Sequence, residues 1–104
     1  MLAAIAVERE GLDAVIPETL NAARYLYMQE LDDGSVCEEL QVAGEADIAR
    51  AVISRGCRAL ICGHISPDTR EALREQDVLC FDGYLYQAQQ VRRLLYTGVL
   101  PGIK

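Results

Sequence analysis

The chain has 104 residues, of which 51% are hydrophobic and 25% are charged, and its formal net charge at pH 7 is −6. This length suits one domain with one core, and the composition excludes a disordered or fibrous chain. The acidic balance disfavours nucleic acid as a partner, because the surface would repel a phosphate backbone. We therefore expect a single domain over residues 1–104 that binds no nucleic acid.

The N-terminal residues predict neither export nor membrane insertion. The opening MLAAIAVE has a short apolar run that ends before Glu8, and it lacks a basic segment. No apolar run in the sequence approaches the length of a membrane span. The four cysteines show no Cys-x-x-Cys spacing, which is typical of reduced thiols in the cytosol rather than of a zinc ribbon or a disulfide framework. A cytoplasmic location is expected.

The first part of the chain predicts three strands. Residues 2–8, LAAIAVE, form a short apolar run, and a polar connection over residues 9–23 follows it. Aromatic and aliphatic side chains alternate over residues 24–31, which predicts a second strand. The Asp-Gly pair in DDGS, residues 32–35, predicts a hairpin, so the more polar residues 36–42 should be its returning arm near a sheet edge.

The spacing of apolar residues then changes from every second residue, as in a strand, to the repeat of about 3.6 residues that is typical of a helix. Residues 44–56 place acidic side chains in the first turn of a predicted helix that Gly56 stops. Residues 57–63, CRALICG, are nearly all apolar, which predicts a strand covered on both faces. A second helix is predicted over residues 66–76, with Ser66 as its N-cap and a proline at its first position.

The last two elements complete a predicted α/β fold. Residues 77–83 indicate another buried strand, and residues 84–98 indicate a helix whose inner stripe is Leu85, Ala88, Val91, Leu94 and Leu95. A hairpin requires antiparallel pairing, and each strand-helix-strand crossover requires parallel pairing. We expect a five-stranded mixed sheet with helices on its faces and with strands 2–8, 57–63 and 77–82 parallel at its centre.

Several stretches, in this order and spacing, carry a resemblance to a known family. They are AAIAV, VIPETLNAARYLYM, GCRALICGHISPDTREAL, DVLCFDG and LYTGVL. Together they resemble the dinitrogenase iron–molybdenum cofactor biosynthesis family, which comprises NifX-like proteins and the C-terminal domains of NifB-type proteins. The resemblance covers nearly the whole chain, and it implies an RNase H-like α/β domain.

The sequence departs from the family pattern at three positions. Leu20-Asn21 replaces Phe-Gly, Asp77 replaces the glycine before the last strand, and Ser66 replaces a glycine that commonly precedes the helix proline. Asn and Asp tolerate left-handed backbone better than other non-glycine residues. We therefore expect Asn21 and Asp77 to preserve the family's turns.

The resemblance implies that the protein binds or carries an iron–sulfur or iron–molybdenum cluster precursor in metallocluster biosynthesis for nitrogen fixation, and that it is not an enzyme. Its implied partners are the proteins that donate or accept the cluster. The alternative is a structural or regulatory protein-interaction module of the same fold without a cluster site. A nuclease of this fold would need converging carboxylates, for which Glu8, Glu30 and Asp82 are candidates, but the acidic surface argues against it.

The candidate ligands follow strand 57–63. Iron–sulfur clusters favour thiolates, sometimes with imidazole. His64, the only histidine, follows this strand at the edge where open α/β sheets bind ligands, and Cys62 should point to the same side. Cys80 lies in the neighbouring strand, so His64, Cys62 and Cys80 are the candidate metal ligands. Ser66 joins the candidate cofactor-binding residues, because the N–H groups at a helix start attract anions.

Each candidate also has a plainer interpretation. His64 is also compatible with a solvated loop residue, and Cys62 and Cys80 are also compatible with small apolar core residues, since free cysteine is among the most buried residue types. We expect residues 63–67 to form an exposed loop from which His64 points outward. Cys37, on the polar hairpin arm, is expected to be exposed and to react first with a thiol reagent.

Overall fold

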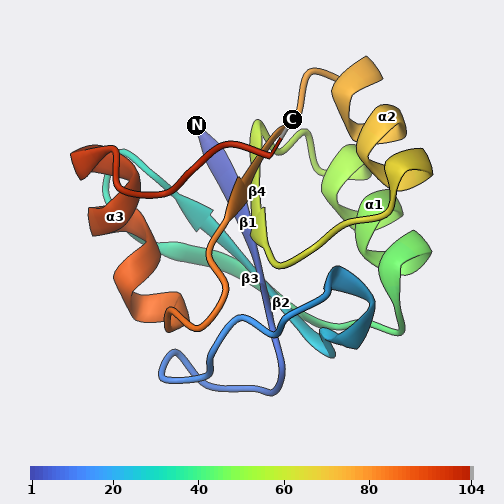
Figure 1. Cartoon of the computed structure of the whole chain (residues 1–104). Coiled ribbons are helices and arrows are strands. Elements are labelled where there is room, and N and C mark those ends of the chain that lie inside the picture. The colour runs from blue at the N-terminus through green and yellow to red at the C-terminus, as the bar shows by residue number, and fades with distance from the viewer. Residues whose placement is uncertain (104) are drawn as a thin grey trace.

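The computed structural model describes residues 1–103, which form a mixed sheet with the strand order β3-β2-β1-β4-β5 (Figure 1). The strands are β1 (Leu2–Val7), β2 (Tyr25–Glu30), β3 (Val36–Gln41), β4 (Ala59–Cys62) and β5 (Leu79–Asp82). Strand β2 is antiparallel to its neighbours β1 and β3, whereas β4 is parallel to β1 and β5 is parallel to β4. The predicted five-stranded mixed sheet of an RNase H-like domain is confirmed.

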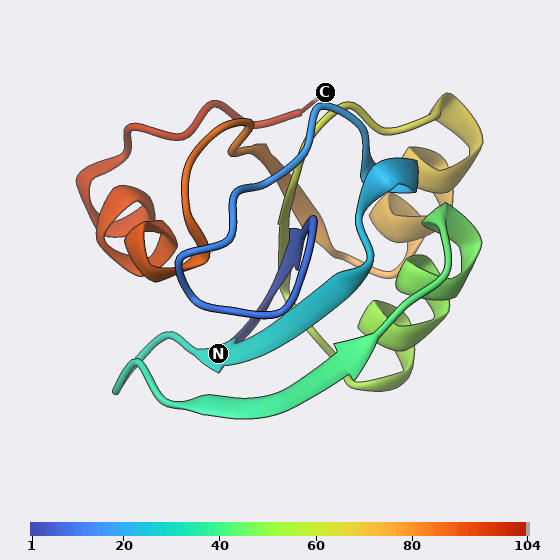
Figure 2. The same ribbon diagram turned by 90° about the horizontal axis from the view of Figure 1, so that it is seen from below.

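Helices cover both faces of the sheet, as Figure 2 shows. Helices α1 (Glu45–Ser54) and α2 (Pro67–Glu75) lie on one face, and α3 (Val91–Thr97) lies on the other. Because side chains alternate along a strand, β1 supplies Ala4 to the core under α1 and α2 and Ile5 to the core under α3. Within residues 1–103, no helix combines the length and apolar character needed to cross a bilayer.

Strand β5 lies at a sheet edge, so the prediction of a central strand at 77–82 was wrong. Its Leu79 side chain is 64% exposed, and the C-terminal residues run along its outer side. There the Asp82 N–H donates to the Pro101 carbonyl (2.9 Å) and the Ile103 N–H donates to the Cys80 carbonyl (2.8 Å). A run of apolar residues indicates that both faces of a strand are buried, but it does not indicate whether another strand pairs with each of its edges. Strands β1 and β4 are central, as expected.

The last helical region begins later than the predicted residue 84. A short 3-10 turn, η2 (Ala88–Gln90), precedes α3, and Leu85 is 65% exposed with a φ of +76°. The backbone of this segment pairs with the chain that follows β1: the Leu85 N–H donates to the Ile16 carbonyl (3.1 Å), and the Ile16 N–H donates to the Tyr86 carbonyl (2.9 Å). These hydrogen bonds hold residues 84–87 out of a helix, and Leu85 is therefore not part of the buried stripe.

Asn21 and Asp77, the two departures from the family pattern that were expected to preserve turns, differ in the backbone conformation that they adopt. Asp77 has a φ of +59°, so the expected left-handed turn before β5 is confirmed. The same expectation for Asn21 was wrong, because Asn21 lies in the 3-10 turn η1 (Leu20–Ala22) and its φ is not positive. Its side chain instead accepts a hydrogen bond from the Glu45 N–H at the start of α1 (3.1 Å). The Asn21 side chain therefore connects η1 to the start of α1.

Gly63 allows the chain after β1 to contact the end of β4. A Cβ atom at Gly63 would lie 2.2 Å from the Pro17 carbonyl oxygen and 2.3 Å from that of Glu18, both backbone atoms.

We predict that Gly63→Ala destabilises the protein by more than about 3 kcal/mol, because these two segments must separate. Gly56→Ala is the matched control: its φ of +67° strains an alanine, but no atom lies within 4 Å, so it should cost only about 1–2 kcal/mol. Urea denaturation of both variants measures the difference, and equal costs would contradict the close approach.

Candidate functional site

A hollow of about 340 Å³ lies at the carboxyl ends of β4 and β5. Its walls come from the loop before η1, the loop after β4, the end of β5 and the C-terminal residues. The lining residues are Glu18, Gly63, His64, Ile65, Asp82, Tyr84 and Ile103. Open α/β sheets bind ligands at the carboxyl ends of their parallel strands, so this hollow is the candidate site.

The backbone of His64 is fixed while its imidazole is free. The His64 N–H donates to the Glu18 carbonyl (2.7 Å), and the His64 carbonyl accepts from the Leu20 N–H (2.8 Å). The side chain is exposed, and it makes no hydrogen bond to any residue in the range 1–103. The expected outward orientation of His64 is therefore observed, but Gly63 and Ile65 are buried, so the prediction of an exposed loop over residues 63–67 was wrong for these two.

The structure brings Cys62 and Cys80 together and keeps them apart from His64. Both thiols are buried in the core beneath α1 and α2, with 0% and 6% exposure. Burial raises the pKa of the Cys62 thiol and of the Cys80 thiol, so both are protonated at neutral pH. No cluster of three or more His, Cys, Asp or Glu side chains in the described part of the chain could hold a metal ion. In this conformation the two cysteines are core residues rather than an assembled ligand set with His64.

Ser66 occupies the N-cap position of α2, but its side chain does not cap that helix. The Ser66 hydroxyl donates to the Glu45 carboxylate, and the Ser66 N–H donates to the same carboxylate oxygen (3.0 Å). Ser66 therefore stands at the predicted N-cap position, but the prediction that its side chain caps α2 was wrong, because the hydroxyl accepts no hydrogen bond from a backbone N–H of that helix. The reason is that Glu45, at the start of α1, supplies a carboxylate to the start of α2, where the helix dipole favours negative charge.

Glu45 is the residue of this region that sequence reasoning missed. Burial opposes its ionisation, but hydrogen bonds from the Ser66 and Thr69 hydroxyls and from the Ser66 N–H outweigh burial, so the pKa of Glu45 lies below its usual value of 4.5. The Glu45 N–H in turn donates to the Asn21 side chain. These partners are distant along the chain, and no local motif connects them.

The hollow has an acidic rim. Glu18 and Asp82 line it with exposed carboxylates, and His64 is the only lining residue with a basic side chain. An imidazole can bind a transition metal through a ring nitrogen at neutral pH. The arrangement therefore offers one free nitrogen ligand in a surface hollow, with negative charge around it.

We predict that Glu45→Gln lowers the free energy of unfolding by about 1–2 kcal/mol at pH 7, because the hydroxyl and N–H donors of Ser66 lose a charged acceptor. The benefit in the unmodified protein is complete above pH 4.5, the usual pKa of this group, and it disappears as the pH falls through the lowered pKa in the folded state. The two proteins should therefore converge in stability in acid. Glu71→Gln, which removes an exposed ion pair with Arg74, is the control and should change stability by less than about 0.5 kcal/mol. A stability gap that persists unchanged in acid would contradict this role.

We predict that Cys37 is the first thiol to react with a soluble aromatic disulfide under native conditions. Cys37 is exposed, whereas Cys57, Cys62 and Cys80 are buried. Burial also raises the pKa of Cys57 to about 11, which lowers its thiolate fraction. Peptide mapping after brief labelling should find the modification on Cys37, and Cys37→Ser should abolish the fast phase. Rapid labelling of a buried cysteine instead would show that the core opens readily.

Comparisons with known proteins give the same fold and a family. A model of the family described as dinitrogenase iron–molybdenum cofactor matches residues 1–98. The apo orange protein from Desulfovibrio gigas superposes with a TM-score of 0.84 at 15% identity, covering 98% of this chain and 92% of that one. A Thermotoga protein provisionally named NifB gives 0.82 at 18% identity, covering 97% and 91%.

A Methanocaldococcus jannaschii protein provisionally named a dinitrogenase gives a TM-score of 0.71 at 16% identity, covering 97% of this chain and 94% of that one. Comparison with curated protein sequences found no match. At these identities the solved structures establish the fold alone. The family match spans nearly the whole chain, and it agrees with the resemblance seen in the sequence. The chain therefore belongs to the dinitrogenase iron–molybdenum cofactor family.

Proposed function

We propose that this protein carries an iron–sulfur or iron–molybdenum cluster precursor between a donor and an acceptor protein in the cytoplasm, without catalysing a reaction. The observation that supports the proposal is the exposed imidazole of His64, which has no hydrogen-bond partner in residues 1–103 and lies in a hollow at the carboxyl edge of the sheet. Family membership supplies the class of cargo. The exposure of His64 and its place in the hollow support an imidazole as the ligand that meets the cargo first.

A single exposed imidazole suits a carrier, because the cargo must be released as readily as it is taken up. The two hydrogen bonds on either side of His64 fix its backbone, so binding orders only the side chain. Ser66 contributes by holding the start of α2 behind His64 through Glu45, since its hydroxyl is already engaged there. Cys62 and Cys80 are protonated core residues in this state, so His64 is the ligand available for first contact.

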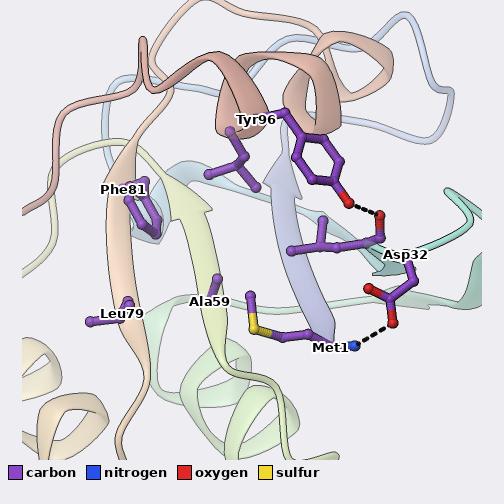
Figure 3. Close-up of a pocket in the computed structure, with 8 residues that line it drawn as sticks. Met1, Asp32, Ala59, Leu79, Phe81 and Tyr96 are labelled. Carbon is purple, nitrogen blue, oxygen red and sulfur yellow. Dashed lines mark hydrogen bonds and ion pairs between the residues drawn. The ribbon is translucent and has the colours of Figure 1, made fainter.

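The protein-interaction module remains a second candidate because of an apolar hollow elsewhere on the surface. Figure 3 shows this hollow of about 340 Å³, which lies between β5 and α3 and near the amino ends of β1, β4 and β5. Leu79 and Tyr96 line it and are 64% and 65% exposed, and the Tyr96 hydroxyl donates to the Leu31 carbonyl (2.7 Å). Its walls are mostly apolar, and the charged groups among the lining residues are the Asp32 carboxylate and the N-terminal ammonium of Met1, which lie 3.6 Å apart. This surface offers contact area and no soft-metal ligand, apart from the Met1 thioether.

Anaerobic reconstitution with ferrous iron and sulfide tests the carrier function. Wild-type protein should retain iron after desalting and show charge-transfer absorption. We predict that His64→Ala weakens cluster binding by at least about tenfold, equivalent to ~1.4 kcal/mol, because the first ligand is lost. The thermal midpoint should hardly change, since an exposed substitution alters stability by less than about 0.5 kcal/mol.

Arg58→Ala is the matched control, because Arg58 is exposed and lies just before β4, whereas His64 lies just after it. It should bind cluster like the wild type. Normal binding by His64→Ala would place the site elsewhere. A wild-type protein that takes up no cluster under these conditions would favour the interaction module.

A further inference from the structure

The C-terminal strap, residues 101–103, borders two separate hollows. Ile103 lines the hollow that contains His64. It also lines a second hollow of about 370 Å³ along the outer side of β5, where Cys80, Arg70 and Arg74 contribute to the walls. Ile103 therefore lies between the hollow that contains His64 and the hollow that contains Cys80.

The strap is held by few contacts. Two backbone hydrogen bonds attach it to β5, from Asp82 to Pro101 and from Ile103 to Cys80, and Gly102 between them is exposed. Ile103 is only partly buried against the core under α1 and α2. Figure 1 shows the segment returning from α3 across to the end of the sheet. Segments with few buried contacts open locally at low free-energy cost, so this strap can separate from β5 while the sheet remains folded.

The two hollows differ in charge. The rim around His64 carries Glu18 and Asp82, whereas the β5 hollow carries Arg70 and Arg74. Arg74 pairs with Glu71 (3.0 Å), and Arg70 forms no ion pair within the described residues. An arginine beside a cysteine favours the thiolate and attracts an anionic cargo. No arginine or lysine lines the hollow that contains His64.

We propose that the C-terminal strap is a gate that lifts from β5 during loading, joins the two hollows and makes Cys80 a second cargo ligand beside His64. This inference rests on the carrier function proposed above. Loading is a ligand exchange without a change of oxidation state: a donor protein's thiolate leaves a metal atom, the Cys80 sulfur bonds to it, and the Cys80 proton passes to the departing thiolate. The strap stays lifted while Cys80 and His64 hold the cargo. It closes when an acceptor protein's thiol gives its proton to the Cys80 sulfur and its thiolate takes the metal atom, so that Cys80 returns to the core as a thiol.

The first test measures the strap without any cluster. In a Cys37→Ser background, which removes the exposed thiol, Cys80 is labelled with a soluble aromatic disulfide and located by peptide mapping. Deletion of residues 101–104 retains the buried Leu100 and should accelerate Cys80 labelling by at least about tenfold. Ile103→Ala keeps the backbone bonds and should give a smaller acceleration. Val99→Ala, at an exposed position just before the strap that lines neither of these two hollows, should have no effect.

The second test measures cluster binding after reconstitution with ferrous iron and sulfide. Cys80→Ala should weaken binding by at least about tenfold, whereas Cys57→Ala, which removes a buried thiol outside both hollows, should not. Unchanged Cys80 labelling in both strap variants would overturn the gate. If Cys80→Ala binds the cluster with wild-type affinity, the proposal that Cys80 is a second ligand is overturned, while the proposed carrier function still stands. The carrier function itself fails if the wild-type protein binds no cluster at all.

Discussion

The close approach of residues 17–20 to Gly63 is the contact on which the candidate site depends. Two carbonyl oxygens occupy the space where any other residue at position 63 would place its Cβ. Since the chain can come this near, His64 exchanges backbone hydrogen bonds with Glu18 and Leu20 on either side. The result is a rigid backbone beneath a free imidazole, at the sheet edge where α/β folds bind ligands.

The same approach positions the helices beside the site. The turn η1 follows directly and places the Asn21 oxygen at the start of α1, where it accepts from the Glu45 N–H. The Glu45 carboxylate then accepts two hydrogen bonds from Ser66 at the start of α2. A series of single contacts thus connects the chain before β2 to both helices on one face. None of these residues needs to touch the cargo.

Much of the fold could be predicted from the sequence, because the evidence for it is local. Alternation over residues 24–31, the Asp-Gly turn, and Gly56 and Pro67 at helix ends each express a rule that acts within a few residues. The edge position of β5 could not be predicted, since VLCF has the same composition whether its outer side meets a strand or the strap. Leu85 was assigned to a helix because its pairing partner, Ile16, lies far away along the chain. For the candidate site, the exposure of His64 followed from its place after a strand, but the Glu45 carboxylate could be recognised only in three dimensions.

The most direct measurement uses the fact that the chain contains one histidine. Protein labelled with ¹⁵N only in histidine can be loaded anaerobically with an iron–sulfur cluster, reduced to a paramagnetic state and studied by pulsed electron paramagnetic resonance. Direct ligation by His64 predicts a resolved ¹⁵N hyperfine coupling that is absent from the unlabelled sample. A cluster that is bound without any such coupling would contradict the assignment of His64 as the cargo ligand.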